Sequence, residues 1–105
     1  FRDFIYSSDF CDGIYKVIKN KKKSKNQIFN ITYGNARSLI DIKNLIKGKF
    51  KFQKFSNLKR DKLMAKRGTL SIKKAKKYLN YQPKFDLVRG FKKYYTWYRK
   101  IYEKK

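Results

Sequence analysis

The amino-acid sequence predicts an α/β fold with few short strands and about four helices. Short runs rich in β-branched and aromatic residues predict strands over residues 3–6, 27–32 and 50–52. The segments between and after them space their apolar residues as helices do. The two kinds of segment alternate along the 105 residues without an internal repeat. A chain of this length forms one domain or one piece of a larger domain, and its expected strands suit the edge of a sheet centred elsewhere.

Polar residues mark where the helices are expected to begin. The four expected caps are Asp9, Ser38, Ser71 and Asp86. Asp41 follows Ser38 by three residues, as in a capping box, and Pro83 ends the helix that Ser71 opens. The last helix is expected to bury a stripe formed by Leu87, Phe91, Tyr94, Tyr98 and Ile101. The lysine-rich run 19–25 is expected to be a solvated loop.

The composition excludes several classes of site. One cysteine and no histidine exclude an internal disulfide, a zinc site built from His and Cys, and a Ser-His-Asp or Cys-His pair. No apolar run approaches the ~20 residues that a membrane helix needs, so no membrane partner is expected. The first residues do not resemble a signal peptide. No metal and no catalytic residue are assigned to the chain.

The formal net charge of +23 has two interpretations. A surface that binds nucleic acid or another polyanion would carry such a charge. An A/T-rich coding sequence would also produce it, because lysine outnumbers arginine 24 to 6 and lysine has A/T-rich codons. Proteins that read nucleic-acid sequence rely more on arginine. Composition alone leaves both interpretations open, and non-specific polyanion binding is expected in either case.

Four segments in chain order resemble one family. They are residues 2–6 (RDFIY), 29–39 (FNITYGNARSL), 67–83 (RGTLSIKKAKKYLNYQP) and 86–98 (DLVRGFKKYYTWY). Together they are similar to the C-terminal part of the extended short-chain dehydrogenase/reductase family, the NAD-dependent nucleotide-sugar epimerases and dehydratases. Thr32 departs from the family pattern, which has glycine there. Ser71 and Lys73 also depart, standing where aspartate and serine are usual.

The resemblance implies a function for the whole chain. Residues 1–105 would be the C-terminal substrate-binding portion of an enzyme similar to UDP-glucose 4-epimerase, without the NAD-binding (Rossmann) half. The expected partners are a nucleotide-sugar substrate and the N-terminal NAD-binding domain, in a cytoplasmic enzyme that is a homodimer at full length. NAD would bind to that other domain and not to this chain, which lacks its glycine-rich turn. Tyr15 and Lys19 show the spacing of the family's catalytic pair, but chance explains it and the pair lies in the wrong element.

Two arginines are candidates for substrate binding. Arg2 matches the family arginine that reaches the diphosphate of the nucleotide sugar, and an arginine fork suits that group chemically. Arg60, with Asp61 beside it, best matches a second family arginine. Arg67 is interpreted as structural, and Asp3 as a hydrogen-bond partner at the end of a strand.

The alternative function is that of a small basic nucleic-acid-binding module. It predicts lysines and aromatic residues interleaved on one open face. The enzyme interpretation predicts buried aromatic residues and dispersed lysines. The helical spacing of Trp97 and the tyrosines near it favours the second arrangement.

Overall fold

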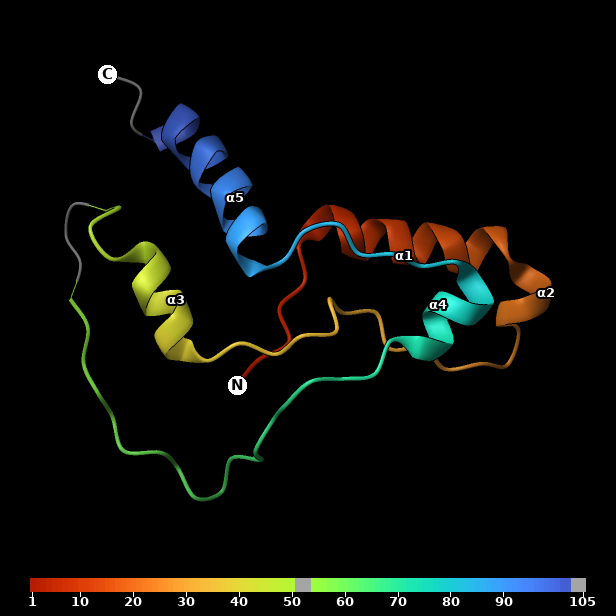
Figure 1. Ribbon diagram of the computed structural model, residues 1–105, viewed down its shortest axis with the longest axis horizontal. Coiled ribbons are helices and arrows are strands. Elements are labelled where there is room, and N and C mark those ends of the chain that lie inside the picture. Colours follow the sequence, from red (N-terminus) through yellow and green to blue (C-terminus); the bar gives the residue numbers. More distant parts are fainter. Residues whose placement is uncertain (51–53, 103–105) are drawn as a thin grey trace.

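The computed structural model describes residues 1–50 and 54–102, and these residues form five helices and no strand. The helices are α1 (Ser7–Lys19), α2 (Lys21–Ser24), α3 (Leu39–Ile46), α4 (Lys73–Leu79) and α5 (Leu87–Tyr102). Figure 1 shows α1, α2 and α4 gathered at one end of the molecule, with α3 and α5 at the other. The predicted α/β fold is therefore wrong for the described part of the chain.

The expected strands fail because they find no neighbours to pair with. A strand is stabilised by a ladder of hydrogen bonds to another strand. Near residues 3–6, the described chain forms a single antiparallel bridge, in which Arg2 and Arg37 exchange backbone hydrogen bonds of 2.8 and 2.7 Å. Segment 27–32 is instead anchored by side chains, as when the Asn30 amide donates to the Ser71 carbonyl at 3.0 Å. The third expected strand, 50–52, lies mostly outside the described residues.

Two of the four expected helix starts are correct, at Ser38 and Asp86, whereas the expected cap at Ser71 is wrong because the N-cap of α4 is Ile72 and has no side-chain cap hydrogen bond. Ser38 and Asp41 form the predicted capping box, in which the Asp41 amide donates to Ser38 Oγ at 3.1 Å. Asp86 accepts from the Arg89 amide at 2.8 Å and begins α5 as expected. The prediction for Asp9 is wrong, because α1 begins at Ser7 and Asp9 lies inside its first turn. The expected loop 19–25 is also wrong, because α1 continues to Lys19 and α2 follows.

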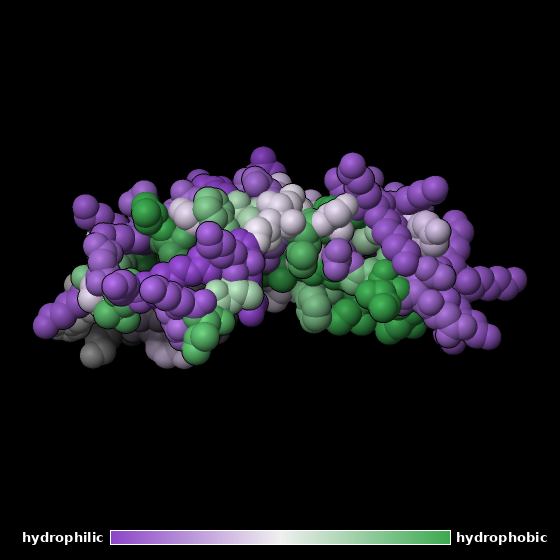
Figure 2. Space-filling model, turned by 90° about the horizontal axis from the view of Figure 1, so that it is seen from below, coloured by the Kyte–Doolittle hydropathy of each residue, from purple (hydrophilic) through white to green (hydrophobic). Residues whose placement is uncertain are grey.

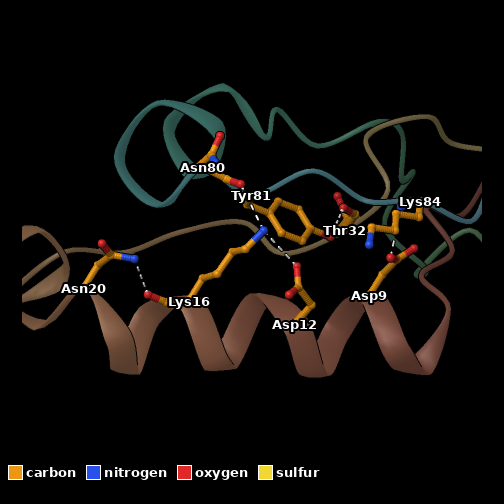
Figure 3. A network of polar contacts seen from close by, with 8 residues as sticks. All are labelled: Asp9, Asp12, Lys16, Asn20, Thr32, Asn80, Tyr81 and Lys84. Carbon is orange, nitrogen blue, oxygen red and sulfur yellow. Dashed lines mark hydrogen bonds and ion pairs between the residues drawn. The ribbon is translucent and has the colours of Figure 1, made fainter.

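The core lies around α4. Its buried apolar residues are Ile72, Ala75, Leu79 and Tyr81, with Val17, Phe29 and Ile31 packed against them. The Tyr81 hydroxyl donates to the Thr32 carbonyl at 2.7 Å, which ties the chain after α4 to the segment that follows α2 (Figure 3). Gly13 permits the close approach of α1, because a Cβ there would lie 2.5 Å from Ile31 Cγ2.

Asp9 joins α1 to the segment before α5. Its side chain is buried, and its two carboxylate oxygens accept from the Lys84 and Phe85 amides, each at 2.9 Å. On the same helix, Asp12 forms an ion pair with Lys16 at 3.1 Å, and the Lys16 ammonium also donates to the Asn80 carbonyl at 3.1 Å. These contacts hold the turn after α4 against α1 (Figure 3).

The molecule is one layer thick. Its principal extents are 50 × 42 × 16 Å, and its radius of gyration is 16.8 Å, against about 13 Å for an ordinary 100-residue domain. Domains normally bury apolar faces between two layers. The stripe expected to be buried on α5 is accordingly wrong in part, because Tyr94 is 46% exposed and Ile101 57% exposed. Figure 2 shows apolar surface open to solvent among the hydrophilic side chains.

Replacing Asp9 by alanine is expected to lower the free energy of unfolding by about 2–4 kcal/mol, because two backbone amides lose a charged acceptor in a buried position. Asp12→Ala is the matched control. It removes a partly exposed ion pair, which is worth at most about 1 kcal/mol. Urea denaturation followed by circular dichroism compares the variants. Equal losses in the two variants would contradict the role assigned to Asp9.

Stability is expected to fall in alkaline solution because of Tyr81. Burial, and then the negative charges of Asp9, Asp12 and Asp3, raise the pKa of its phenol to about 12. Between pH 10 and 12 the phenol of Tyr81 loses its proton in the unfolded chain and keeps it in the folded chain. The contribution of the protonated phenol to the free energy of unfolding is therefore complete below pH 10 and is lost as pH rises to 12. The slope is at most about 1.4 kcal/mol per pH unit. Unfolding of wild type and Tyr81→Phe from pH 8 to 12 measures this. A stability difference that stays constant with pH would contradict it.

Candidate anion-binding site

Two open cavities share a group of cationic side chains in their walls. The first has a volume of about 500 Å³, and its walls include Phe1, Arg2, Leu39, Arg60, Met64 and Arg67. The second has a volume of about 690 Å³ and is lined by residues 2–5 and 66–70. Arg2, Lys66 and Arg67 line both cavities. An elongated ligand that occupied both cavities would therefore pass these three positive charges.

Arg2 is fixed through its backbone. The bridge to Arg37 sets the N-terminal segment beside the residues that lead into α3. The Arg37 side chain is engaged elsewhere, since its Nε donates to the Asp41 carboxylate at 3.1 Å. The pKa of Asp41 is lowered by the hydrogen bond from the Ser38 backbone and then by Arg37. The Arg37 charge is thus partnered at the start of α3, while Arg2 lines the cavities.

Arg60 is placed by a turn in the long loop between α3 and α4. The Met64 amide donates to the Asp61 carbonyl at 3.2 Å, and the Leu63 amide donates to the Asp61 carboxylate at 2.9 Å. Arg60 Nη2 donates to the Met64 carbonyl at 2.9 Å. The loop therefore folds back on itself, and Arg60 and Met64 line the same cavity as Arg2.

The structure brings together the two arginines that the sequence singles out, because Arg2 and Arg60 line one cavity. It adds Lys66 and Arg67, which sequence reasoning missed as site residues. The sequence signals that could have found them are the basic pair directly before Gly68 and, for Arg67, its place at the start of the family-like segment 67–83. Tyr15 is 58% exposed on α1 and lines neither cavity.

The first cavity has the electrostatic character of an anion site. Four cationic side chains line it, and none of the described residues in its walls is acidic. Arginine forks bind phosphate through paired, charge-assisted hydrogen bonds. The described residues contain no group of three His, Cys, Asp or Glu side chains that would hold a metal ion. No described helix has the length and apolar character needed to cross a membrane.

The aromatic residues of α5 form a second feature. Trp97 is 51% exposed and packs against Tyr94 at 5.8 Å between ring centroids, and Tyr102 is 64% exposed. Cations lie beside rings here, with Lys93 Nζ 4.5 Å from the centroid of Phe85. The expectation that Trp97 belongs to the core is wrong. Exposed aromatic residues beside lysines are the arrangement that the nucleic-acid alternative predicts.

No family model matches the chain, and no solved structure matches it.

The chain is expected to bind nucleic acid without sequence preference and to lose that affinity with salt. Lysines that bind phosphates release the counterions of the nucleic acid, so added salt weakens the complex. A protein with 6–10 phosphate contacts loses a factor of about 10³–10⁵ in affinity when the salt rises from 50 to 200 mM. Fluorescence anisotropy with three unrelated double-stranded oligonucleotides measures this. Tight binding of one oligonucleotide over the others at 200 mM salt would contradict the expectation and favour the nucleic-acid alternative.

Proposed function

We propose that the chain is the substrate-binding part of an NAD-dependent nucleotide-sugar epimerase or dehydratase, similar to UDP-glucose 4-epimerase, and is not catalytic by itself. The observation that carries the proposal is that Arg2, Lys66 and Arg67 line both cavities. The four segments with the family pattern support it, since two of them contain Arg2 and Arg67.

A nucleotide sugar has the shape that this arrangement fits. Its diphosphate lies in the middle, with a nucleoside on one side and a sugar on the other. The shared cations suit the diphosphate, because guanidinium groups pair with phosphate oxygens. Phe1, Leu39 and Met64 give the first cavity apolar walls, which suit the flat face of a base. The second cavity then receives the sugar.

NAD does not fit the residues of this chain. A dinucleotide site needs closely spaced glycines at the start of a helix, so that backbone amides face the pyrophosphate. Gly34, at φ +87°, lies in a turn, but its amide donates to Asp3 at 3.0 Å. The other four glycines are scattered. The proposal therefore places NAD on an N-terminal domain that acts as the partner of this chain, in a cytoplasmic enzyme that is a homodimer at full length.

The thin shape supports such a partner. A layer of 16 Å leaves apolar side chains without a second layer to cover them. On α1, Phe10, Ile14 and Ile18 follow one another at i, i+4 and i+8, and all three are exposed. A stripe of this kind normally faces another element. In the proposal, the NAD-binding domain covers part of this apolar surface.

A nucleic-acid-binding module is the second candidate function. The exposed Tyr94, Trp97 and Tyr102 on the lysine-bearing helix α5 favour it. It offers no account of the two cavities or of the order of the four segments. The nucleotide-sugar proposal explains both features, and the same exposed aromatic residues are also consistent with a missing protein layer.

Arg2→Ala is expected to weaken binding of UDP-glucose by roughly ten- to hundredfold, because a charged hydrogen bond to phosphate is worth about 1.5–3 kcal/mol. Arg60→Ala is expected to act in the same direction. Arg89→Ala is the control, since it removes the same charge from an exposed position on α5. Isothermal titration calorimetry gives the dissociation constants, with GDP-mannose and dTDP-glucose as further ligands.

The control separates local contacts from the general attraction of a cationic chain. Equal weakening by Arg89→Ala would show that only the net charge matters. Unchanged dissociation constants in Arg2→Ala and Arg60→Ala would remove both residues from the site. No binding of any of the three nucleotide sugars by the wild-type chain would overturn the proposed function.

A further inference from the structure

We infer that Asp3 is the positioning residue of the proposed diphosphate site, which it holds together without contacting the ligand. This inference rests on the proposed function. Arg2 belongs to the first residues of the chain, whereas Lys66 and Arg67 belong to the loop before α4. More than sixty residues separate these cations, so local structure cannot bring them together. Asp3 supplies a link between the two segments.

The Asp3 carboxylate gathers three segments of the chain. Oδ1 accepts from the amides of Gly34 and Asn35, at 3.0 and 3.3 Å. Oδ2 accepts from the Thr32 hydroxyl at 3.0 Å and from the Leu70 amide at 3.1 Å. The carboxylate thus joins the N-terminal segment, the turn after residue 32 and the end of the loop that carries Arg67.

The position of these contacts fixes the cations. Asp3 is the next residue after Arg2, and Leu70 follows Arg67 by only three residues. Three residues of extended chain span at most about 11 Å, so the bond to the Leu70 amide limits how far Arg67 can move from Arg2. The Ala36 amide, which donates to the Thr69 hydroxyl at 2.9 Å, supports the same alignment one residue earlier. The two walls of the cavities are therefore held in register.

Asp3 acts through its neighbours and not by direct contact. A carboxylate has about four acceptor positions, and donors of the chain already occupy four at Asp3. A hydroxyl group of the ligand would find none free. The negative charge by itself would repel a diphosphate. On charge alone, removal of Asp3 would strengthen binding, whereas the positioning role predicts that it weakens binding.

Because the two roles predict opposite changes in ligand affinity when Asp3 is replaced, substitution of Asp3 distinguishes them. Asp3→Asn keeps the shape of the side chain but turns an amide NH₂ toward amide or hydroxyl donors of the chain. Asp3→Glu keeps the charge and moves the carboxylate by one methylene group. Asp12→Asn is the control, because it removes one negative charge from α1, where Asp12 pairs with Lys16 at 3.1 Å. Calorimetric titrations with UDP and with UMP give the dissociation constants for each protein.

We expect Asp3→Asn to weaken UDP binding by at least about tenfold, because cations that lose their alignment would lose at least one charged hydrogen bond to phosphate. Asp3→Glu should also weaken it, although its charge is unchanged. UMP binding should change less, because one phosphate needs fewer aligned cations, so the preference for UDP over UMP shrinks. Asp12→Asn should leave UDP binding unchanged or slightly stronger.

Three results would overturn the inference. One is UDP binding in Asp3→Asn that equals or exceeds that of the wild type. Another is an equal loss for UDP and UMP, which indicates a general loss of structure. The third is absence of UDP binding by the wild type, which overturns the proposed function as well. This result is distinguishable from the first two, because those appear only in the variants. Where Asp3→Asn does not fold, Thr32→Val replaces it, because this substitution removes one of the four donors and keeps the carboxylate. If Thr32→Val and Asp3→Glu both bind UDP as tightly as the wild type does, the inference is overturned.

Discussion

The structure depends on hydrogen bonds that a few carboxylates accept from distant segments of this strongly cationic chain. The sequence has seven acidic residues against thirty basic ones. The longest-range links come from Asp3, which joins residues 32–35 and 70, and from Asp9, which joins α1 to residues 84 and 85. Asp41 and Asp86 cap α3 and α5. Because only four of the apolar residues that the structure describes are buried, these hydrogen bonds supply stability that a larger core supplies in other domains.

The same charge shapes the surface of the molecule. Positive charges spread over a molecule only 16 Å thick repel one another. Self-association of such a surface is electrostatically unfavourable, whereas an acidic partner or a bound polyanion would relieve the repulsion. In the proposed enzyme, acidic residues on the NAD-binding domain would relieve this repulsion where that domain covers the exposed stripe of α1.

The two cavities are formed by hydrogen-bonded extended segments and not by packed helices. The cations that line both of them come from the N-terminal segment and from a loop, and the described helices contribute only Leu39 at the first cavity. Sites on loops need a rigid frame to be selective. Here the frame is made by hydrogen bonds between extended segments, chiefly the Arg2–Arg37 bridge and the acceptors of Asp3. In the proposed site, ligand binding and local stability would therefore both depend on the Asp3 carboxylate.

The sequence by itself determined several features that depend on neighbours three or four residues apart, although it misplaced the caps at Asp9 and Ser71. The capping box of Ser38 and Asp41, the cap at Asp86 and the end of α4 before Pro83 all belong to this class. It also singled out Arg2 and Arg60 through the resemblance. The tertiary structure alone decided whether segments 3–6 and 27–32 pair, which face of α5 is covered, and that Lys66 and Arg67 line the same cavities as Arg2. Those outcomes depend on contacts between residues far apart in the chain, and helical spacing or strand propensity carries no information about which distant partner is present.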